Sequence, residues 1–159
     1  PGSFTGLRLA FSALKAIELS NNVPIYGISS LKSYSFEFEN FSFPILTVID
    51  AKKDKFYANI IHNNEIILKD GDYDISFLID EINHFDNLIL CGPDAQAFYD
   101  NNKSNINNKN VFLPKINSIS TESLFLIAES MIENNVSPLK DFDGPVYLRA
   151  SEAEIKKNE

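Results

Sequence analysis

The sequence is poor in the side chains that build metal centres and covalent links. It contains one cysteine, two histidines and no tryptophan among 159 residues. The single cysteine, Cys91, excludes an internal disulfide and is typical of a reducing, cytoplasmic compartment. Together with His62 and His84 it lacks the spacing of a zinc or other metal site. We therefore expect no bound metal.

Long apolar runs and an excess of positive charge are missing too. The longest apolar stretch, residues 43–49, is far shorter than the roughly 20 residues of a membrane-spanning helix. Lysines and arginines number 14 against 22 acidic residues, which gives a net charge of −8. Phosphate backbones are held by clustered Lys and Arg side chains, so the charge argues against autonomous nucleic-acid binding. We expect a soluble protein without membrane contact, whose partners are basic or hold the nucleic acid themselves.

The composition and patterning are those of a globular α/β protein. Hydrophobic residues make up 44% and aromatic residues 12% of the chain. We expect one α/β domain over residues 1–150, followed by a polar tail at 151–159. Ser29 or Ser30 offers a cap for a further short helix. The patterns predict helices at 5–19, 75–82, 95–99 and 120–132, and strands at 23–28, 44–50, 55–62, 65–68, 87–91 and 111–113.

A glycine-rich loop opens the chain. Gly2 and Gly6 flank Ser3, Phe4 and Thr5 just before the first predicted helix. Backbone N–H groups and the helix dipole at such a position favour an anion. The loop lacks the Gly-Lys-Ser or Gly-Lys-Thr of a P-loop, and it is not a Gly-x-Ser-x-Gly elbow. Two interpretations stay open, namely a tight turn that only serves packing and a loop that contacts phosphate or another ligand.

The helix after this loop is apolar on nearly every side. Its polar residues form one narrow stripe, made of Arg8, Ser12, Lys15 and Glu18. A surface helix of a monomer normally buries a single apolar stripe, whereas this helix has enough apolar surface for two. Either it lies at the centre of its own core, or part of its surface belongs to a partner.

Several segments resemble the TsaB (YeaZ) family of bacterial tRNA threonylcarbamoyladenosine biosynthesis proteins. The opening "PGSFTGLRLAFSALKAIEL" is the most specific of them. The segments "VPIYGISSL", "PILTVIDAKKDKFYA", "LILCGPDA" and "PVYLR" follow in the order of the family, over essentially the whole chain. The chain begins inside the first motif, so we expect it to lack the family's N-terminal subdomain. Lys52 and Lys55 stand where the family often carries an arginine and an acid.

The resemblance implies a domain of the actin/Hsp70-like (RNase H-like) ATPase superfamily, with a mixed sheet flanked by helices. It implies a non-catalytic scaffold that pairs with a TsaD-like paralogue, or with a second copy, and works with a TsaE-like ATPase. Their complex modifies tRNAs that decode ANN codons, and this chain would meet tRNA only through the complex. The chain itself would require no cofactor, while ATP or ADP at the partner interface is left open.

The resemblance also assigns roles to residues near the start of the chain. The first helix would contribute to the dimer interface, and the preceding loop would be the place of any ligand contact. The expected interface residues are Leu7, Arg8, Ala10, Phe11, Leu14, Lys15 and Ile17. The expected loop residues are Gly2, Ser3, Phe4, Thr5 and Gly6. No catalytic residue is expected.

Two enzyme functions compete with the scaffold. A nucleotide-dependent enzyme of the same superfamily would need an acid facing phosphate, for which Asp50 at the end of a buried strand is the candidate. A peptidase would need Ser3 or Ser12 beside a positioned base, and His62 and His84 are the available histidines. Neither histidine has an evident acid to orient it.

Overall fold

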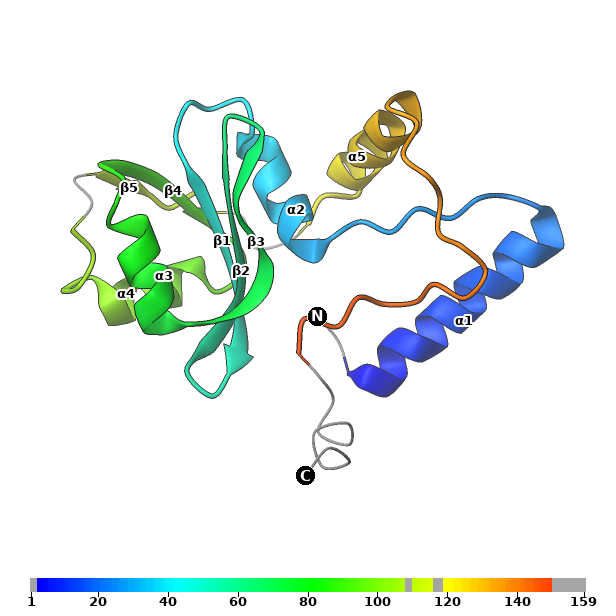
Figure 1. The fold of residues 1–159 in the computed structure, drawn as a ribbon, viewed down its shortest axis with the longest axis horizontal. Helices are drawn as coiled ribbons and strands as arrows, with labels where there is room; N and C mark the ends of the chain where they lie inside the picture. Colours follow the sequence, from blue (N-terminus) through cyan, green and yellow to red (C-terminus); the bar gives the residue numbers. More distant parts are fainter. Residues whose placement is uncertain (1–2, 108–109, 116–118, 150–159) are drawn as a thin grey trace. The chain divides into compact units, whose positions relative to one another are not determined.

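The computed structural model describes residues 3–107, 110–115 and 119–149 (Figure 1). Gly2 and the predicted tail at 151–159 lie outside the described residues. The chain divides into two compact units. The sheet unit is Ser29–Phe125, and the helical unit combines the residues before Ser29 with those after Phe125.

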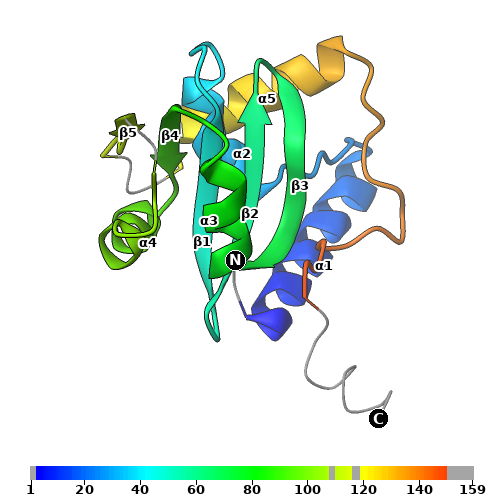
Figure 2. The ribbon, with the colours of Figure 1, turned by 60° about the vertical axis from the view of Figure 1, so that its left-hand side comes forward.

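The sheet unit is built on five strands in the order β3-β2-β1-β4-β5. β1, β2 and β3 form an antiparallel meander, whereas β4 and β5 run parallel to β1 (Figure 2). The strands are β1 Ile45–Lys52, β2 Lys55–His62, β3 Glu65–Asp74, β4 Asn87–Cys91 and β5 Asn110–Phe112. The helices are α2 Ser30–Ser35, the 3-10 turn η1 Phe36–Phe38, α3 Ile75–Ile82 and α4 Ala95–Asn102. Helix α5, Thr121–Glu133, begins in this unit and ends in the helical unit.

Helices cover both faces of the sheet, which explains the continuous apolar run of β1. Leu46 and Val48 point into a core shared with α3 and α4. Ile45 points to the other face, where Tyr34 packs against it. Helix α2 lies on that face of the sheet (Figure 1). A strand buried on both faces needs apolar residues at successive positions. The mixed α/β architecture predicted from the sequence is thus confirmed.

Left-handed backbone positions shape the turns between the strands. Asn63 and Asn64 have φ values of 52° and 63°, as expected for a two-residue turn between β2 and β3. The turn from β1 to β2 places Lys52, Lys53 and Asp54 at φ values of 61°, 58° and 56°. These are unusual conformations for residues other than glycine or asparagine, and they fix the direction in which the turn leaves the sheet.

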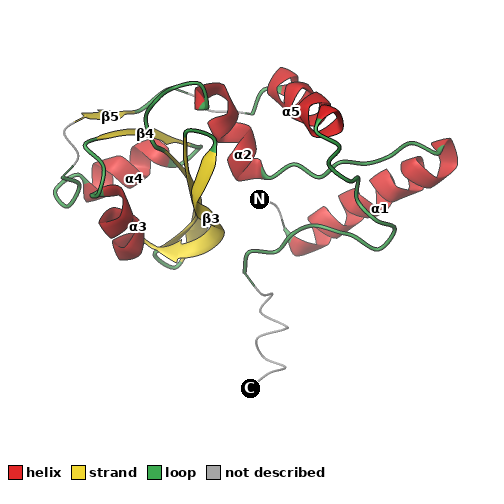
Figure 3. Ribbon diagram, turned by 45° about the horizontal axis from the view of Figure 1, so that its top comes forward, coloured by secondary structure: helices red, strands yellow, loops and turns green. Residues whose placement is uncertain are grey.

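The helical unit contains α1, Phe4–Asn21, which confirms the first predicted helix. Asn22 ends it in a left-handed conformation with φ of 53°. The strand predicted at 23–28 is wrong, because this segment has no regular structure (Figure 3). Its Ile25 carbonyl accepts a bond of 2.8 Å from the Leu139 N–H, which holds the extended segment without a ladder of strand pairs. None of the described helices is long and apolar enough to cross a membrane.

Candidate functional site

The residues predicted to form an opening loop belong mainly to the first turn of α1. The helix begins at Phe4, so Phe4, Thr5 and Gly6 are helical, which corrects the predicted loop. Ser3 is the N-cap, and its Oγ accepts a hydrogen bond of 3.1 Å from the Gly6 N–H. A Cβ on Gly6 would lie 2.9 Å from that oxygen. This glycine therefore leaves room for the cap, and the ligand contact of the loop stays a prediction.

One stripe of α1 lies against the chain itself. Leu7, Phe11, Lys15 and Glu18 are the half-buried residues of this helix. Lys15 Nζ donates to the Lys140 carbonyl at 2.7 Å and forms an ion pair of 2.7 Å with Glu18. Two members of the polar stripe predicted from the sequence, Lys15 and Glu18, thus lie on the covered side of α1. Three predicted interface residues, Leu7, Phe11 and Lys15, lie on this covered stripe.

Residues 139–147, which we call the strap, run along α1 (Figure 1). The Phe4 ring packs against Tyr147 with centroids 4.9 Å apart. The Arg8 guanidinium lies 4.2 Å from the Phe4 ring centroid, a cation–π contact. The strap therefore joins the first and last described parts of the chain into one unit.

The remaining apolar surface of α1 is exposed. Leu9, Leu14 and Ile17 have 71%, 46% and 54% of their surface accessible. Ala10, Ala13 and Ala16 lie between them and are exposed too. None of the 18 residues of α1 is buried. We call Leu9, Ala10, Ala13, Leu14, Ala16 and Ile17 the free face. Contiguous apolar surface is a common feature of association sites in proteins, because covering it removes the cost of its hydration.

A cavity of about 420 Å³ opens in the sheet unit where β1 and β4 end. The carboxyl ends of parallel strands meet at one edge of a sheet, the usual place of ligand sites in α/β folds. Its lining includes the charged Asp50, Lys52 and Asp94 together with the aromatic Phe56 and Phe98. Sequence reasoning found Asp50 but missed Asp94. The signal was the Gly-Pro-Asp sequence after β4, which becomes informative once β4 is paired with β1.

Hydrogen bonds hold the acids of this cavity in place. Asp94 Oδ2 accepts a bond of 2.8 Å from the Asp50 N–H. The Asp50 carboxylate accepts from the Lys52 N–H at 2.7 Å and forms an ion pair with the Lys52 ammonium. The side-chain bond from Lys52, followed by its backbone bond, lowers the pKa of Asp50. Asp50 is therefore ionised at neutral pH, and its charge is balanced by its own neighbour.

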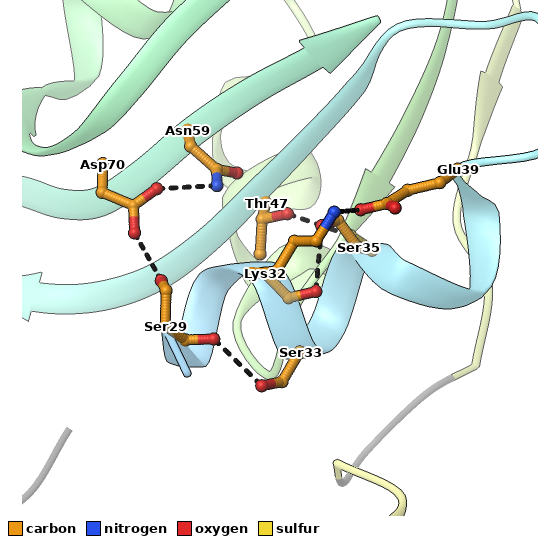
Figure 4. A network of polar contacts seen from close by, with 9 residues as sticks. Ser29, Lys32, Ser33, Ser35, Glu39, Thr47, Asn59 and Asp70 are labelled. Atoms are coloured by element: carbon orange, nitrogen blue, oxygen red, sulfur yellow. Dashed lines mark hydrogen bonds and ion pairs between the residues drawn. The ribbon is translucent and has the colours of Figure 1, made fainter. Parts of the chain in front are cut away.

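A layer of small polar side chains lies between α2 and the sheet (Figure 4). Asn59 Nδ2 donates to Asp70 at 2.9 Å, and Asp70 also accepts from the Ser29 hydroxyl. The Thr47 hydroxyl lies 3.4 Å from Cys91 Sγ. Burial raises the pKa of Cys91 to about 12, against the opposing effect of the Thr47 hydrogen bond. A buried protonated thiol is a poor nucleophile, so Cys91 is poorly suited to nucleophilic chemistry.

Both serines of the peptidase interpretation, and His62, have other partners. Ser3 caps α1, and the Ser12 hydroxyl donates to the Arg8 carbonyl at 2.9 Å. His62 Nε2 lies 3.3 Å from the Ser42 carbonyl oxygen. Within the described parts of the chain, no group of three His, Cys, Asp or Glu residues could hold a metal ion. The described geometry therefore gives no support to a nucleophile–base pair at these residues.

Comparisons with known proteins identify the family. The family model described as "TsaD: tRNA N6-adenosine threonylcarbamoyltransferase" matches residues 1–82. No protein of curated function matches the chain. A Pseudomonas aeruginosa protein described as uncharacterized, with similarity to peptidase YEAZ, superposes with a TM-score of 0.60 at 16% identity. The match covers 94% of this chain and 70% of that one.

A second solved structure, YeaZ from Pseudomonas aeruginosa, gives a TM-score of 0.58 at 16% identity, over 93% of this chain and 70% of that one. At this identity the two structures establish the fold, and they agree with the YeaZ (TsaB) resemblance of the sequence motifs. The family match spans 82 of 159 residues. The chain therefore belongs to the tRNA N6-adenosine threonylcarbamoyltransferase (TsaD) family, and it has the actin-like α/β fold of the YeaZ structures.

Proposed function

We propose that this chain is a non-catalytic partner subunit in the threonylcarbamoyladenosine modification of tRNAs that decode ANN codons. It acts through a heterodimer with a TsaD-like paralogue, supported by a TsaE-like ATPase, and reaches tRNA only through that complex. Family membership and the YeaZ-like fold support the pathway. The observation that carries the scaffold role is the free face of α1, whose Leu9, Leu14 and Ile17 are all exposed.

The free face is the proposed docking surface. Its residues come from two successive helical turns, so a partner helix could lie along them. The small side chains of Ala10, Ala13 and Ala16 allow close approach. Burial of apolar surface at about 25 cal/mol per Å² drives the association, opposed by the loss of free motion on binding. Of the interface residues predicted from the sequence, Ala10, Leu14 and Ile17 belong to this face.

Charge substitutions on α1 test the docking surface. Leu14→Asp or Ile17→Asp is expected to weaken binding of the TsaD-like paralogue by about 100-fold or more, because an unpaired carboxylate enters the interface. The matched control is Leu19→Asp, on the polar side of the helix and 78% exposed. Titration calorimetry measures the dissociation constants, and circular dichroism checks the melting temperatures. Equal binding by all three variants would refute this docking surface.

Nucleotide binding is a second candidate function, favoured by the cavity beside Asp50 and Asp94. The ion pair with Lys52 already neutralises the negative charge of Asp50 in this cavity. Binding of ATP or ADP with Mg²⁺ to the isolated chain, measured by calorimetry, tests this function. Saturable binding that is lost in Asp50→Asn and kept in Asp100→Asn, a change outside the cavity, would establish it. Absence of heat above the dilution control would count against nucleotide binding by this chain.

A further inference from the structure

The strap contains a tight turn at residues 140–143. The Asp143 N–H donates to the Lys140 carbonyl at 3.0 Å. In return, the Lys140 N–H donates to Asp143 Oδ2 at 2.7 Å. These reciprocal bonds pair polar groups of the turn with one another. Aspartate side chains often form such local bonds to the backbone in loops. The conformation of the turn is therefore defined by its own residues.

The turn is also fixed to α1. Lys15 Nζ donates to the Lys140 carbonyl at 2.7 Å, and Glu18 holds the same ammonium at 2.7 Å. The preceding residue, Leu139, bonds to the Ile25 carbonyl through its N–H at 2.8 Å. Two elements of the helical unit, α1 and the segment 23–28, thus hold the turn. Little conformational entropy is therefore lost when the turn binds a partner.

This fixed turn presents a fully exposed aromatic ring. Phe142 has 102% of its reference surface accessible, the largest value among the exposed apolar side chains described. A single exposed apolar residue is ordinary on a protein surface. Phe142 differs because several hydrogen bonds hold its turn in one conformation, so the place from which its side chain projects is fixed. Asp141 and Asp143 flank the ring in the sequence. Aromatic side chains that become buried on binding dominate the energetics of many interfaces.

We propose that residues 140–143 form an acidic aromatic knob that inserts Phe142 into an apolar pocket with a lysine- or arginine-rich rim on the TsaD-like partner. This inference rests on the proposed function, and it adds a second contact beside the free face of α1. Asp141 and Asp143 outnumber the single positive charge of Lys140, so the turn is net negative and favours a basic rim, with a charge complementarity that also speeds the encounter.

A second copy of this chain is the less suitable occupant. Its apolar groove of about 270 Å³ is lined by Phe38, Phe41, Phe43, Ile89, Phe112, Leu113 and Pro114. None of these lining residues carries a charge that would pair with Asp141 or Asp143. The chain also has a net charge of −8, so two copies repel each other. The knob therefore fits a basic partner better than itself.

Calorimetric titration of the full chain with the purified TsaD-like protein of the same genome tests the knob. Phe142→Ala is expected to weaken binding by about tenfold or more, as truncation of a central aromatic anchor does. Asp141→Asn is expected to weaken it less, with an effect that shrinks as salt is raised. Val146→Ala, at an 86% exposed position of the same strap, is the matched control and should bind like the wild type.

The outcomes separate the two proposals. If the wild type binds and Phe142→Ala binds equally well, the knob is refuted while the scaffold role stands. If the wild type itself fails to bind, the proposed function fails and the knob fails with it. Self-association of the wild type that is lost in Phe142→Ala, seen by sedimentation velocity, would assign the knob to a second copy and overturn the partner named here.

Discussion

At the scale of single residues, Gly92 occupies a position where the backbone leaves no room for a side chain. It follows β4 with φ of 106°, and a Cβ there would lie 2.2 Å from the Val48 carbonyl oxygen. Gly92→Ala is expected to lower the free energy of unfolding by about 2 kcal/mol or more, since both strain and a backbone clash oppose it. Gly144→Ala, with no atom within 4 Å of the added Cβ, is the control and should change it by less than about 0.5 kcal/mol. Urea unfolding measures both, and equal stabilities would contradict this packing.

Cys91 reports on the closure of the sheet core. Its thiol is 1% exposed, and burial raises its pKa to about 12. We expect a thiol-specific reagent at pH 8 to label the native protein only at the rate of unfolding, and to label the protein in urea at once. Rapid labelling of the native protein would show that the α2 layer opens readily.

The same pKa shift predicts an alkaline loss of stability. The unfolded thiol ionises near its ordinary value of 9.0, while the folded thiol stays protonated up to about 12. Between these values the unfolded chain binds fewer protons, so the Cys91 contribution is complete below pH 9 and declines as pH rises. Urea midpoints of the wild type and Cys91→Ser from pH 8 to pH 11 test this, because the decline should be steeper in the wild type.

At the scale of elements, Lys15 is expected to hold the strap on α1. Lys15→Met removes the bond to Lys140 and the ion pair with Glu18 while keeping the apolar stem. Chymotrypsin should then cut the strap after Phe142 and Tyr147 several-fold faster, with little change in the melting of the sheet unit. Lys103→Met, just after α4, is the control and should leave the cleavage rate unchanged. Unaltered cleavage in Lys15→Met would show that other contacts hold the strap.

Individual elements also show what the sequence could predict. β2, α3 and β4 were predicted with their observed bounds, because local periodicity and turn residues such as Asn63 and Asn64 define them. The segment 23–28 looked like a strand because it is apolar, yet its described backbone bonds join Val23 to Glu18 of α1 and Ile25 to Leu139 of the strap rather than to a neighbouring strand. Which stripe of α1 is covered depends on a strap more than 120 residues away in sequence, and no local pattern carries that information. For the same reason the pairing of β4 with β1, and so the cavity at Asp94, was missed.

At the scale of the whole molecule, two units of unequal packing coexist in one chain. The sheet unit has apolar clusters on both faces of the sheet, with Leu46, Val48 and Leu90 fully buried. Helix α1 of the helical unit has no buried residue. Amides in a region with a buried core exchange their hydrogens only when a large part of that region unfolds. The part proposed to bind the partner is therefore also the part with the weakest internal packing.

This difference predicts a gradient of hydrogen exchange that a partner would abolish. In the free protein, amides of β1 and β4 should exchange only by global unfolding, whereas those of α1 should exchange much faster by local opening. Saturation with the TsaD-like paralogue should slow exchange along α1 and the strap and leave β1 unchanged, because a ligand protects the region it orders. Mass-spectrometric exchange of wild type and Leu14→Asp compares the two states directly. Slow exchange of α1 in the free protein would mean that the helix is already fully stabilised, and the free face would then lose its role as the surface that the partner completes.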